Sequence, residues 1–495
     1  MKKMNLLVMS LVSAAAFSFS SCSSNDDLGG GAGTQSQVKG FYMTLAVQTP
    51  TSNGTRTAQS NETSATAAES DVTSGTLYLV NANGEVAFSK NISAAEWQES
   101  KIPTQGQTGK TQIQIQVEKV AAGATYKVYF LANTTDSKPW ENNIITATSK
   151  FAEPYVTANN FAMFNQNDAT VDGNGYTVVF TDANKNSEVP AQVKYNSETS
   201  AIKIERIAAR IDEPNPASKK ITAYAGTNAT EAEKRAMADA LNKVQGLELT
   251  RYAISNLAKK SYIMQKWADE TTLTIPSDIT YWNPAGEFGS EKKFEHADHF
   301  TAATAAFAHQ DYVFENNSAT SPSTMYFEYK VTLKDMTNAD FPEDGTFYRY
   351  NNVIYKSFED ILKAYKDVAG LFKGQTADQL KAELANAKKV ETGEGAKDVE
   401  TKLADFRAKY DIEVFNEGKT YYKQVIQDQY LKKDKELIPN VIQRNSIYQL
   451  TVNNIFNIGA QVPNGKIDKT ALFYLDVTVS VNPWVLNSQG VNLGE

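Results

Sequence analysis

The sequence has little of the material from which many active sites are built. Its 495 residues contain one cysteine and three histidines. A single cysteine excludes an intramolecular disulfide, a CxxC zinc site and a two-thiol redox centre. Basic residues number 49 and acidic residues 57, so the formal net charge is −8. This mild acidic excess gives no reason to expect a nucleic-acid partner.

Long apolar runs are scarce as well. After residue 19 no stretch is long and apolar enough to cross a membrane as a helix. Aromatic residues are plentiful by contrast, with 23 Phe and 24 Tyr within a hydrophobic fraction of 41%. This content is enough to build a sizeable core and argues against global disorder. A length of 495 residues predicts two domains with insertions.

Residues 1–22 have the pattern of a lipoprotein signal peptide. Lys2 and Lys3 precede an apolar run over residues 6–19, which is too short to span a bilayer as a stable helix. A charged start, an apolar middle and small residues before a cleavage point are typical of a secretory signal. Cys22 stands at the cleavage position, as in a lipobox, so we expect lipid on Cys22 and anchoring to a membrane. The alternative is a plain signal peptide with an incidental cysteine.

The next part of the chain predicts a tether and a first strand. Residues 23–40 are rich in Ser, Gly and Asn, which is typical of a flexible tether. Residues 41–47 alternate between two faces, as a half-buried strand does. The apolar face of this strand consists of Phe41, Met43, Leu45 and Val47.

The remainder predicts a mainly β protein. The dipeptide Asn83-Gly84 between two apolar runs indicates a tight hairpin. Short strands at hairpin spacing favour antiparallel sandwiches. We expect two antiparallel β-sandwich (transthyretin-like) domains over residues 57–211 and 212–495. The predicted strands cover 77–80, 86–88, 113–117, 126–131, 176–180, 202–211, 247–254, 326–333, 421–426, 447–456 and 472–481.

Two regions predict helices. Residues 228–245 are rich in Ala and Leu and have suitable caps. A second helical block covers about 357–410, where Ser357 can cap the first turn with Asp360 three residues on. Its charged second half, 381–409, favours a solvated helical insertion in the C-terminal domain.

Candidate catalytic or metal-binding residues are few. His296 and His299 are three residues apart, but no spacing fixes a third ligand, so solvated imidazoles are the better interpretation. Residues 182–193 resemble a calcium loop, yet Ser187 replaces the required Gly and Val193 the bidentate Glu. No GxSxG elbow or HExxH is present. We therefore predict no enzyme, no catalytic residue, no metal and no cofactor.

A possible cleavage point follows the first strand. Arg56 is the only basic residue between Lys39 and Lys90, and it lies in a polar segment with a turn-forming Asn-Gly. Such a segment is exposed and easily cut. A trypsin-like protease acting between Arg56 and Thr57 would separate strand 41–47 from everything after it. The alternative is an ordinary arginine in a surface loop.

The other end of the chain carries an apolar tail. Apolar and polar residues alternate from 473 to 481, and we expect Asn482-Pro483 to interrupt this strand because proline cannot donate to a ladder. The alternative is a final core strand with a frayed end. The apolar residues beyond the proline are Trp484, Val485, Leu486, Val491 and Leu493.

Short pieces along nearly the whole chain resemble one protein family. They are Cys22 with its lipobox, 42–45 followed by Arg56, 204–210, 259–262, 444–448 and 476–484. With these pieces in this order, the chain resembles a Bacteroidales type V pilus subunit of the FimA/minor-fimbrillin superfamily, most closely the minor-fimbrium fimbrillin. The helical block 357–410 is less clearly part of the shared pattern.

The resemblance implies a mechanism. Subunits of this family travel as outer-membrane lipoproteins and are cut after an Arg, which removes the first strand and opens a groove. A C-terminal strand of another copy then fills the groove by β-strand addition. On this sequence the removed strand is 41–47, within a propeptide of 23–56, the cut follows Arg56, and the donor is most naturally 484–493. Head-to-tail contacts that do not close into a ring give a filament.

The resemblance also implies partners and a role. The expected partners are other copies of the chain, anchor and tip subunits, and an Arg-specific protease, and the expected product is a surface fimbrium for adhesion and biofilm formation. Because the chain has both a cleavage Arg and a donor tail, a stalk subunit is favoured over a tip or anchor subunit. The alternative from another class is a monomeric surface lipoprotein that binds glycan through its five Trp residues.

Overall fold

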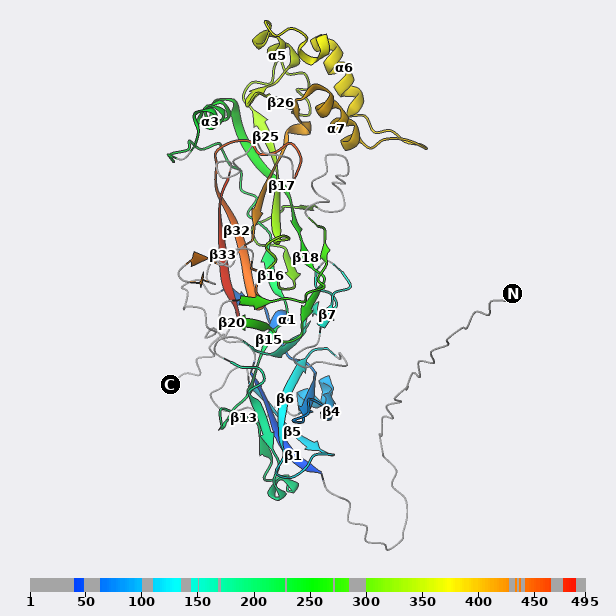
Figure 1. Ribbon diagram of the computed structural model, residues 1–495, viewed down its shortest axis with the longest axis vertical. Helices are drawn as coiled ribbons and strands as arrows, with labels where there is room; N and C mark the ends of the chain where they lie inside the picture. The colour runs from blue at the N-terminus through cyan, green and yellow to red at the C-terminus, as the bar shows by residue number, and fades with distance from the viewer. Residues whose placement is uncertain are drawn as a thin grey trace, which may run out of the picture. The chain divides into compact units, whose positions relative to one another are not determined.

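The computed structural model describes most of the chain after residue 39. The described residues are 40–48, 63–99, 110–134, 144–149, 151–167, 171–227, 229–269, 272–284, 300–426, 432–433, 436–437, 441–463 and 475–486. Gly40–Glu495 form one compact unit. This unit is mainly β, as predicted (Figure 1).

An eleven-stranded sheet gathers the N-terminal strands. Its path runs β12–β1–β15–β10–β6–β11–β13–β14, while β5 pairs with β1, and β3 pairs with β4 and β6. The strands are β1 Phe41–Gln48, β3 Gly75–Val80, β4 Val86–Ile92, β5 Lys110–Val117, β6 Thr125–Ala132, β10 Met163–Asn165, β11 Tyr176–Val179, β12 Ala191–Gln192, β13 Lys194–Tyr195, β14 Glu198–Thr199 and β15 Ile202–Arg206.

The predicted Asn-Gly hairpin is confirmed between β3 and β4. Asn81 N–H donates to the Glu85 carbonyl at 2.9 Å and closes the turn. Gly84 has a φ of +81°, a conformation that glycine adopts without the steric cost of a side chain. The turn therefore follows directly from the local sequence.

Two further sheets hold the C-terminal strands. One has the order β2–β33–β32–β16–β24, and the other β23–β17–β25–β29. Their side chains share a core that includes Ile211, Tyr448, Leu249 and Phe327. The strands are β2 Thr63–Ala65, β33 Leu475–Leu486, β32 Ser446–Ile455, β16 Ala209–Asp212, β24 Gln310–Val313, β23 Thr301–Ala302, β17 Val244–Ser255, β25 Thr324–Leu333 and β29 Lys419–Val425.

The remaining described strands form short sheets. The pairs are β18 Leu257–Ala258 with β22 Tyr281–Trp282, β19 Lys260–Tyr262 with β7 Ile144–Thr146, β20 Lys266–Asp269 with β21 Thr272–Thr274, β30 Lys432–Lys433 with β31 Glu436–Leu437, and β8 Val156–Thr157 with β9 Asn160–Phe161. A three-stranded sheet joins β27 Val353–Tyr355, β26 Phe347–Tyr350 and β28 Glu413–Phe415.

The expected strand over 202–211 is wrong as a single element. The chain forms β15, leaves the first sheet at Ile207 and Ala208, and forms β16 in a different sheet. Both strands and the two residues between them are buried except for Lys203. The continuous apolar content hides the change of sheet, because burial on both sides of the junction looks alike in the sequence.

The expectation of antiparallel sheets also needs correction. Most pairings are antiparallel, but β1 runs parallel to β12 and β15, β16 parallel to β32, and β2 parallel to β33. Parallel neighbours need a long connection between them. Each of these pairs is distant in the chain, so the short-range pattern that suggested hairpins carries no information about them.

Helices are few among the described residues. They are α1 Ala67–Ser70, α2 Ala94–Glu99, α3 Glu231–Lys243, α5 Phe358–Ala364, α6 Ala377–Ala387 and α7 Val399–Tyr410, with the 3-10 turns η1 Asp182–Lys185, η2 Leu371–Gly374 and η3 Asn416–Gly418. The predicted helix over 228–245 is confirmed as α3, which Thr230 and Glu233 close with a capping box. No described helix meets the length and apolarity of a membrane span.

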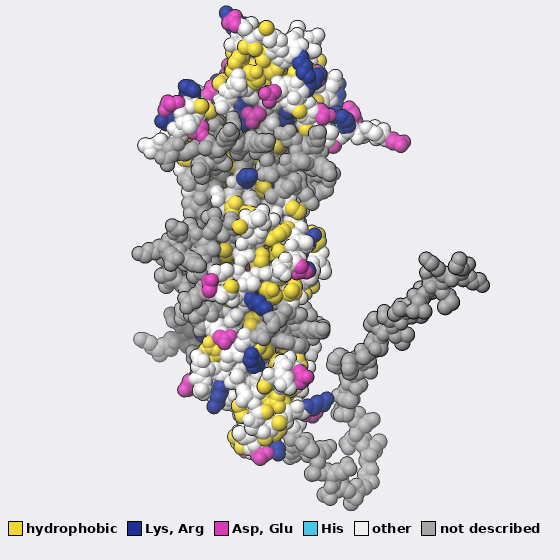
Figure 2. All heavy atoms as spheres, in the orientation of Figure 1, with side chains coloured by type: hydrophobic (Ala, Val, Ile, Leu, Met, Phe, Trp, Pro, Cys, Tyr) yellow, Lys and Arg dark blue, Asp and Glu magenta, His cyan; other side chains and the backbone are white. Residues whose placement is uncertain are grey.

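The helical block 357–410 has its own core. Ser357 caps α5 by accepting the Asp360 backbone N–H, as predicted. The charged half is more than a solvated decoration, because Leu384, Leu403 and Phe406 are buried against Phe358 in one cluster. Basic and acidic side chains lie intermingled on the visible face of this block (Figure 2).

Candidate functional site

The first strand, β1, is hydrogen-bonded to neighbours along both edges. Its whole length pairs with β5, from Phe41 opposite Val117 to Gln48 opposite Lys110. Its other edge runs parallel to β12 at Met43 and Thr44 and to β15 at Val47 and Gln48. β1 is therefore an interior strand of the sheet.

Every second side chain of β1 is buried, as predicted. Met43 and Leu45 are 0% exposed, Val47 is 2% and Phe41 is 9% exposed, while the residues between them are half-buried. Phe41 packs against Phe180 with ring centroids 5.4 Å apart. Burying a large apolar side chain contributes roughly 1.5–3 kcal/mol, so these four contribute about 6–12 kcal/mol in total.

The predicted lipidation and cleavage residues lie outside the described residues. These are Cys22, Arg56 and Thr57. The chain is described up to Gln48 and again from Thr63, which begins β2. Residues 49–62 thus join an interior strand of the first sheet to a strand in a different sheet.

The C-terminal strand β33 extends further than predicted. It pairs antiparallel with β32 from Leu475 opposite Ile455 to Pro483 opposite Ser446, and it continues to Leu486. The expected interruption at Asn482-Pro483 is wrong. Proline is tolerated in a strand where its missing N–H faces no partner, and β2 joins the other edge of β33 only from Trp484 onward. Val491 and Leu493 lie outside the described residues.

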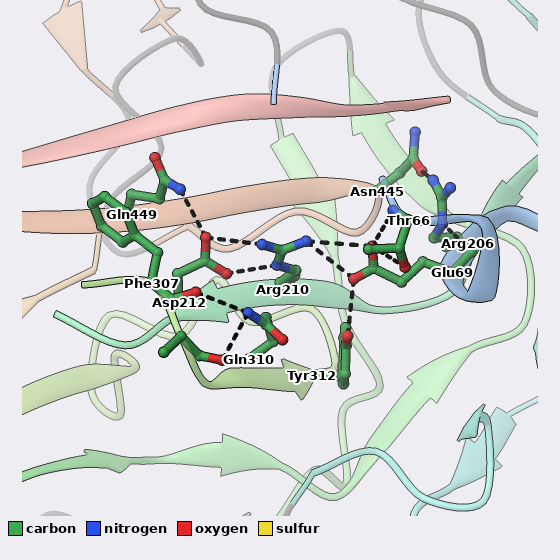
Figure 3. Close-up of polar contacts among 11 residues, drawn as sticks. Thr66, Glu69, Arg206, Arg210, Asp212, Phe307, Gln310, Tyr312, Asn445 and Gln449 are labelled. Atoms are coloured by element: carbon green, nitrogen blue, oxygen red, sulfur yellow. Dashed lines mark hydrogen bonds and ion pairs between the residues drawn. The ribbon is translucent and has the colours of Figure 1, made fainter. Parts of the chain in front are cut away.

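A buried ion cluster holds the segment that follows β2. Glu69 of α1 is 3% exposed. Its carboxylate accepts the Thr66 backbone N–H at 2.7 Å and the Tyr312 hydroxyl at 2.9 Å, and it forms an ion pair with Arg210 at 3.1 Å. Figure 3 shows Arg210 lying between Glu69 and Asp212, whose carboxylate pairs with Arg210 Nε at 2.6 Å.

Arg206 ties the same segment to the main chain. This side chain is 0% exposed. Its Nε donates to the Glu69 carbonyl at 2.7 Å, and its Nη1 donates to Asn445 Oδ1 at 2.8 Å (Figure 3). Since Arg206 ends β15 and Asn445 precedes β32, the contact joins segments that belong to different sheets.

The charges in this cluster depend on burial and on their partners. Burial alone would raise the pKa of the Glu69 carboxyl, but the Thr66 backbone N–H, the Arg210 charge and the Tyr312 hydroxyl hold that pKa below its usual value. Burial lowers the pKa of Arg206 to about 9. Both groups are therefore charged at neutral pH.

A second buried arginine gathers other pieces of the family pattern. Arg444 Nη1 donates to the Ile263 carbonyl at 2.7 Å, and its Nη2 donates to the Tyr262 carbonyl at 2.6 Å and pairs with Glu315 at 2.8 Å. The pieces 204–210, 259–262 and 444–448 thus meet through buried arginines. These short segments are structural contacts of the fold.

Sequence reasoning missed the acidic partners in these clusters. Glu69, Asp212 and Glu315 are separated by up to 246 residues, and nothing in their local sequence marks them as buried. The arginines did carry a signal for a buried ion pair. Arg206 and Arg210 stand in a strongly apolar segment, and a buried arginine requires a carboxylate or carbonyl partner.

Two family models match the chain. One, described as the major fimbrial subunit protein FimA, matches residues 41–206. The other, described as the C-terminal part of the type IV major fimbrial subunit protein fimbrillin, matches residues 413–490. The chain is thus fimbrillin-like over these two segments. The first match in this fimbrillin-like chain begins with β1, and the second includes β32 and all of β33.

Solved structures similar to this fimbrillin-like chain come from Parabacteroides distasonis and Porphyromonas gingivalis. A Parabacteroides distasonis protein assigned to cell adhesion has a TM-score of 0.45 at 14% identity and covers 91% of this chain and 99% of its own. The tip fimbrial protein Mfa3 of Porphyromonas gingivalis, truncated at its C-terminus, has a TM-score of 0.28 at 11% identity and covers 90% of this chain and 99% of its own. A Parabacteroides distasonis fimbrial assembly protein has a TM-score of 0.26 at 11% identity and covers 60% of this chain and 99% of its own. No curated protein matches the chain.

The other candidate residues of the fimbrillin-like chain have structural roles where they are described. Residues 182–185 form η1, and Asn184 Oδ1 accepts the Thr181 backbone N–H at 2.7 Å. His296 and His299 lie outside the described residues. Within the described ranges no group of three His, Cys, Asp or Glu side chains is placed to hold a metal ion. Trp97 is 1% exposed and stacks on Phe130, so it belongs to the core.

Proposed function

We propose that this chain is a structural fimbrial subunit that polymerises by exchanging a β-strand. The precursor is exported as a lipoprotein with lipid on Cys22, and an Arg-specific protease cuts between Arg56 and Thr57. The cut releases the propeptide with β1 and leaves a groove in the first sheet. The C-terminal segment of another copy enters the groove, and repetition builds a surface fimbrium.

The position of β1 supports the proposal. It is an interior strand with a buried apolar face and full-length pairing to β5. Its removal would expose the edge of β5 together with the pockets of Met43, Leu45 and Val47. An exposed apolar edge is a template for another strand. Before the cut β1 covers this edge, which would prevent premature assembly.

The donor is the end of the chain, with Trp484, Val485, Leu486, Val491 and Leu493 as its apolar residues. A replacement strand has to present apolar side chains to the groove at alternate positions. Each buried one contributes roughly 1.5–3 kcal/mol, and ladder hydrogen bonds add about 0.5–1.5 kcal/mol each. An interface of this kind between two subunits dissociates slowly, although no covalent bond holds it.

The role in the filament is that of a stalk subunit. A stalk subunit needs both an acceptor groove and a donor tail, and this chain has a candidate cleavage Arg and an apolar C-terminal segment. In this proposal the first sheet and the C-terminal sheets form two transthyretin-like sandwich domains, and the change of sheet at Ile207 and Ala208 comes a few residues before the predicted boundary at 212. A tip or anchor subunit would lack one of the two exchanges.

The test follows the purified precursor during digestion by an Arg-specific protease. We expect the chain to shorten at Arg56 and to form a ladder of polymers on unboiled gels. Arg56→Ala should abolish both, and deleting residues 484–495 should permit shortening but abolish the ladder. Arg235→Ala, which changes an exposed arginine of α3, is the matched control. Equal ladders from the precursor and Arg56→Ala would refute cleavage-gated assembly.

A further inference from the structure

The first described segment after the proposed cut lies beside the end of the C-terminal strand. Thr63, Ser64 and Ala65 of β2 pair in parallel with Trp484, Val485 and Leu486 of β33. The register between β33 and β32 ends at Pro483. Among the described residues, β2 is therefore the strand that pairs with the last three residues of β33.

The helix α1 fixes β2 to the rest of the molecule. Glu69, Arg206, Arg210 and Tyr312 form a cluster that we name the Glu69 clamp, in which both the carboxylate and the carbonyl of Glu69 accept hydrogen bonds. The Ala68 carbonyl also accepts the Asn159 backbone N–H at 2.7 Å. Thr66, the residue that follows β2, donates its backbone N–H to the Glu69 carboxylate, so the clamp allows β2 little freedom.

Cleavage would change how β2 is held. In the intact chain β2 is joined covalently to the interior strand β1 through residues 49–62, and it is held by the Glu69 clamp on its other side. A cut after Arg56 would break the covalent link to β1 and leave the clamp. The clamp lies C-terminal to the cut, so it stays with the trimmed subunit.

We propose that the Glu69 clamp makes β2 a latch on the end of β33. A trimmed subunit keeps Trp484–Leu486 in place until β2 is displaced, and the strength of the clamp sets how often this end of β33 opens. The latch rests on the proposed function for its biological purpose, since the held segment is the proposed donor. The physical claim concerns the monomer alone.

Hydrogen exchange on the monomeric chain tests the latch. Exchange of the segment 484–486, whose amides that face β2 are the protected ones, is measured by mass spectrometry at low protein concentration, before and after the cut. We expect Glu69→Gln to speed this exchange by roughly ten- to a hundredfold in the cut chain, the range for losing a hydrogen bond to a charged group. The effect should be smaller in the uncut chain, where β2 is still joined covalently to β1.

Two further variants make the outcome decisive. Tyr312→Phe removes one hydroxyl from Glu69, keeps the ring and should speed the exchange by a smaller factor. Glu413→Gln weakens the ion pair with buried Arg349 far from β2 in the sequence and should leave Val485 and Leu486 unchanged. The latch is refuted if Glu69→Gln leaves the exchange unaltered, or if Glu413→Gln raises it equally. Polymer formation is not the readout, so failure of the strand-exchange proposal would be seen separately.

Discussion

Arg210 is the residue on which two buried carboxylates of this protein converge. Its side chain is 9% exposed and faces the carboxylates of Glu69 and Asp212, which are 4% and 0% exposed. Taking three charges out of water is costly, and mutual attraction offsets that cost only while all partners are present. Two buried carboxylates therefore depend on one guanidinium.

Replacing Arg210 should destabilise the protein strongly. Arg210→Met leaves both carboxylates buried without their cation, and breaking a buried pair in this way typically costs about 3–5 kcal/mol. Urea denaturation of the uncut chain measures the loss. Lys234→Ala is the control, because it breaks a pair with Glu231 on the exposed face of α3 and should change stability by less than about 1 kcal/mol. Similar losses from both variants would contradict a special role for burial.

His309 should titrate above its ordinary range. Its Nε2 lies 3.0 Å from Asp311 Oδ1, and this hydrogen bond raises the pKa of His309, although partial burial opposes the shift. The protonated form is favoured by folding. Its contribution to stability is therefore complete below the unfolded pKa of about 6.5 and is lost as pH rises through the folded pKa.

Nuclear magnetic resonance can follow this titration because the chain has only three histidines. We expect one imidazole signal with a midpoint above 6.5 and expect Asp311→Asn to lower that midpoint. The Glu213 charge also favours the protonated ring, so some elevation should remain in the variant. A midpoint that does not respond to Asp311→Asn would contradict the assigned hydrogen bond.

At the scale of elements, local signals predicted structure well wherever neighbours in the chain decide it. The caps of α3 and α5 and the Asn-Gly turn between β3 and β4 involve residues only a few positions apart. Signals failed where a distant segment decides. The split of 202–211 into β15 and β16 depends on which strands lie beside each part, and β33 continues past Pro483 between two partners that are distant from it or short, β32 up to Pro483 and β2 from Trp484.

The buried face of β1 gives a stability prediction that depends on the cut. In the uncut chain Leu45→Ala should cost about 2–5 kcal/mol, since it leaves a cavity at a fully buried position. Ala46→Ser, on the half-buried face of the same strand, is the control and should cost much less. Both are measured by urea denaturation before and after digestion. If β1 leaves with the propeptide, the difference between the variants disappears after the cut. A difference that persists would show that β1 stays in the sheet.

At the scale of the whole molecule, the first and last described strands lie in different sheets but are linked through the residues after the proposed cut. β1 belongs to the first sheet, whereas β33 pairs with β32 and β2 in another. Alternating patterns predicted the strand at each end. The link between them could not be predicted, because Glu69 and Arg210 are 141 residues apart and neither β2 nor α1 is long enough to produce a periodic signal.

The groove left by β1 should accept the strand that once filled it. If polymers grow by inserting a donor into that groove, a synthetic peptide of residues 41–48 added in excess to freshly cut subunits should compete and shorten the ladder on unboiled gels. The matched control has the same composition with neighbouring residues exchanged, so that its apolar side chains point to the opposite face; a shift of one position moves every side chain out of register with the pockets. Inhibition by the native peptide alone would support a groove that β1 has vacated, with pockets that match the alternating side chains of Phe41, Met43, Leu45 and Val47. Equal inhibition by both peptides, or by neither, would mean that subunits join through another surface.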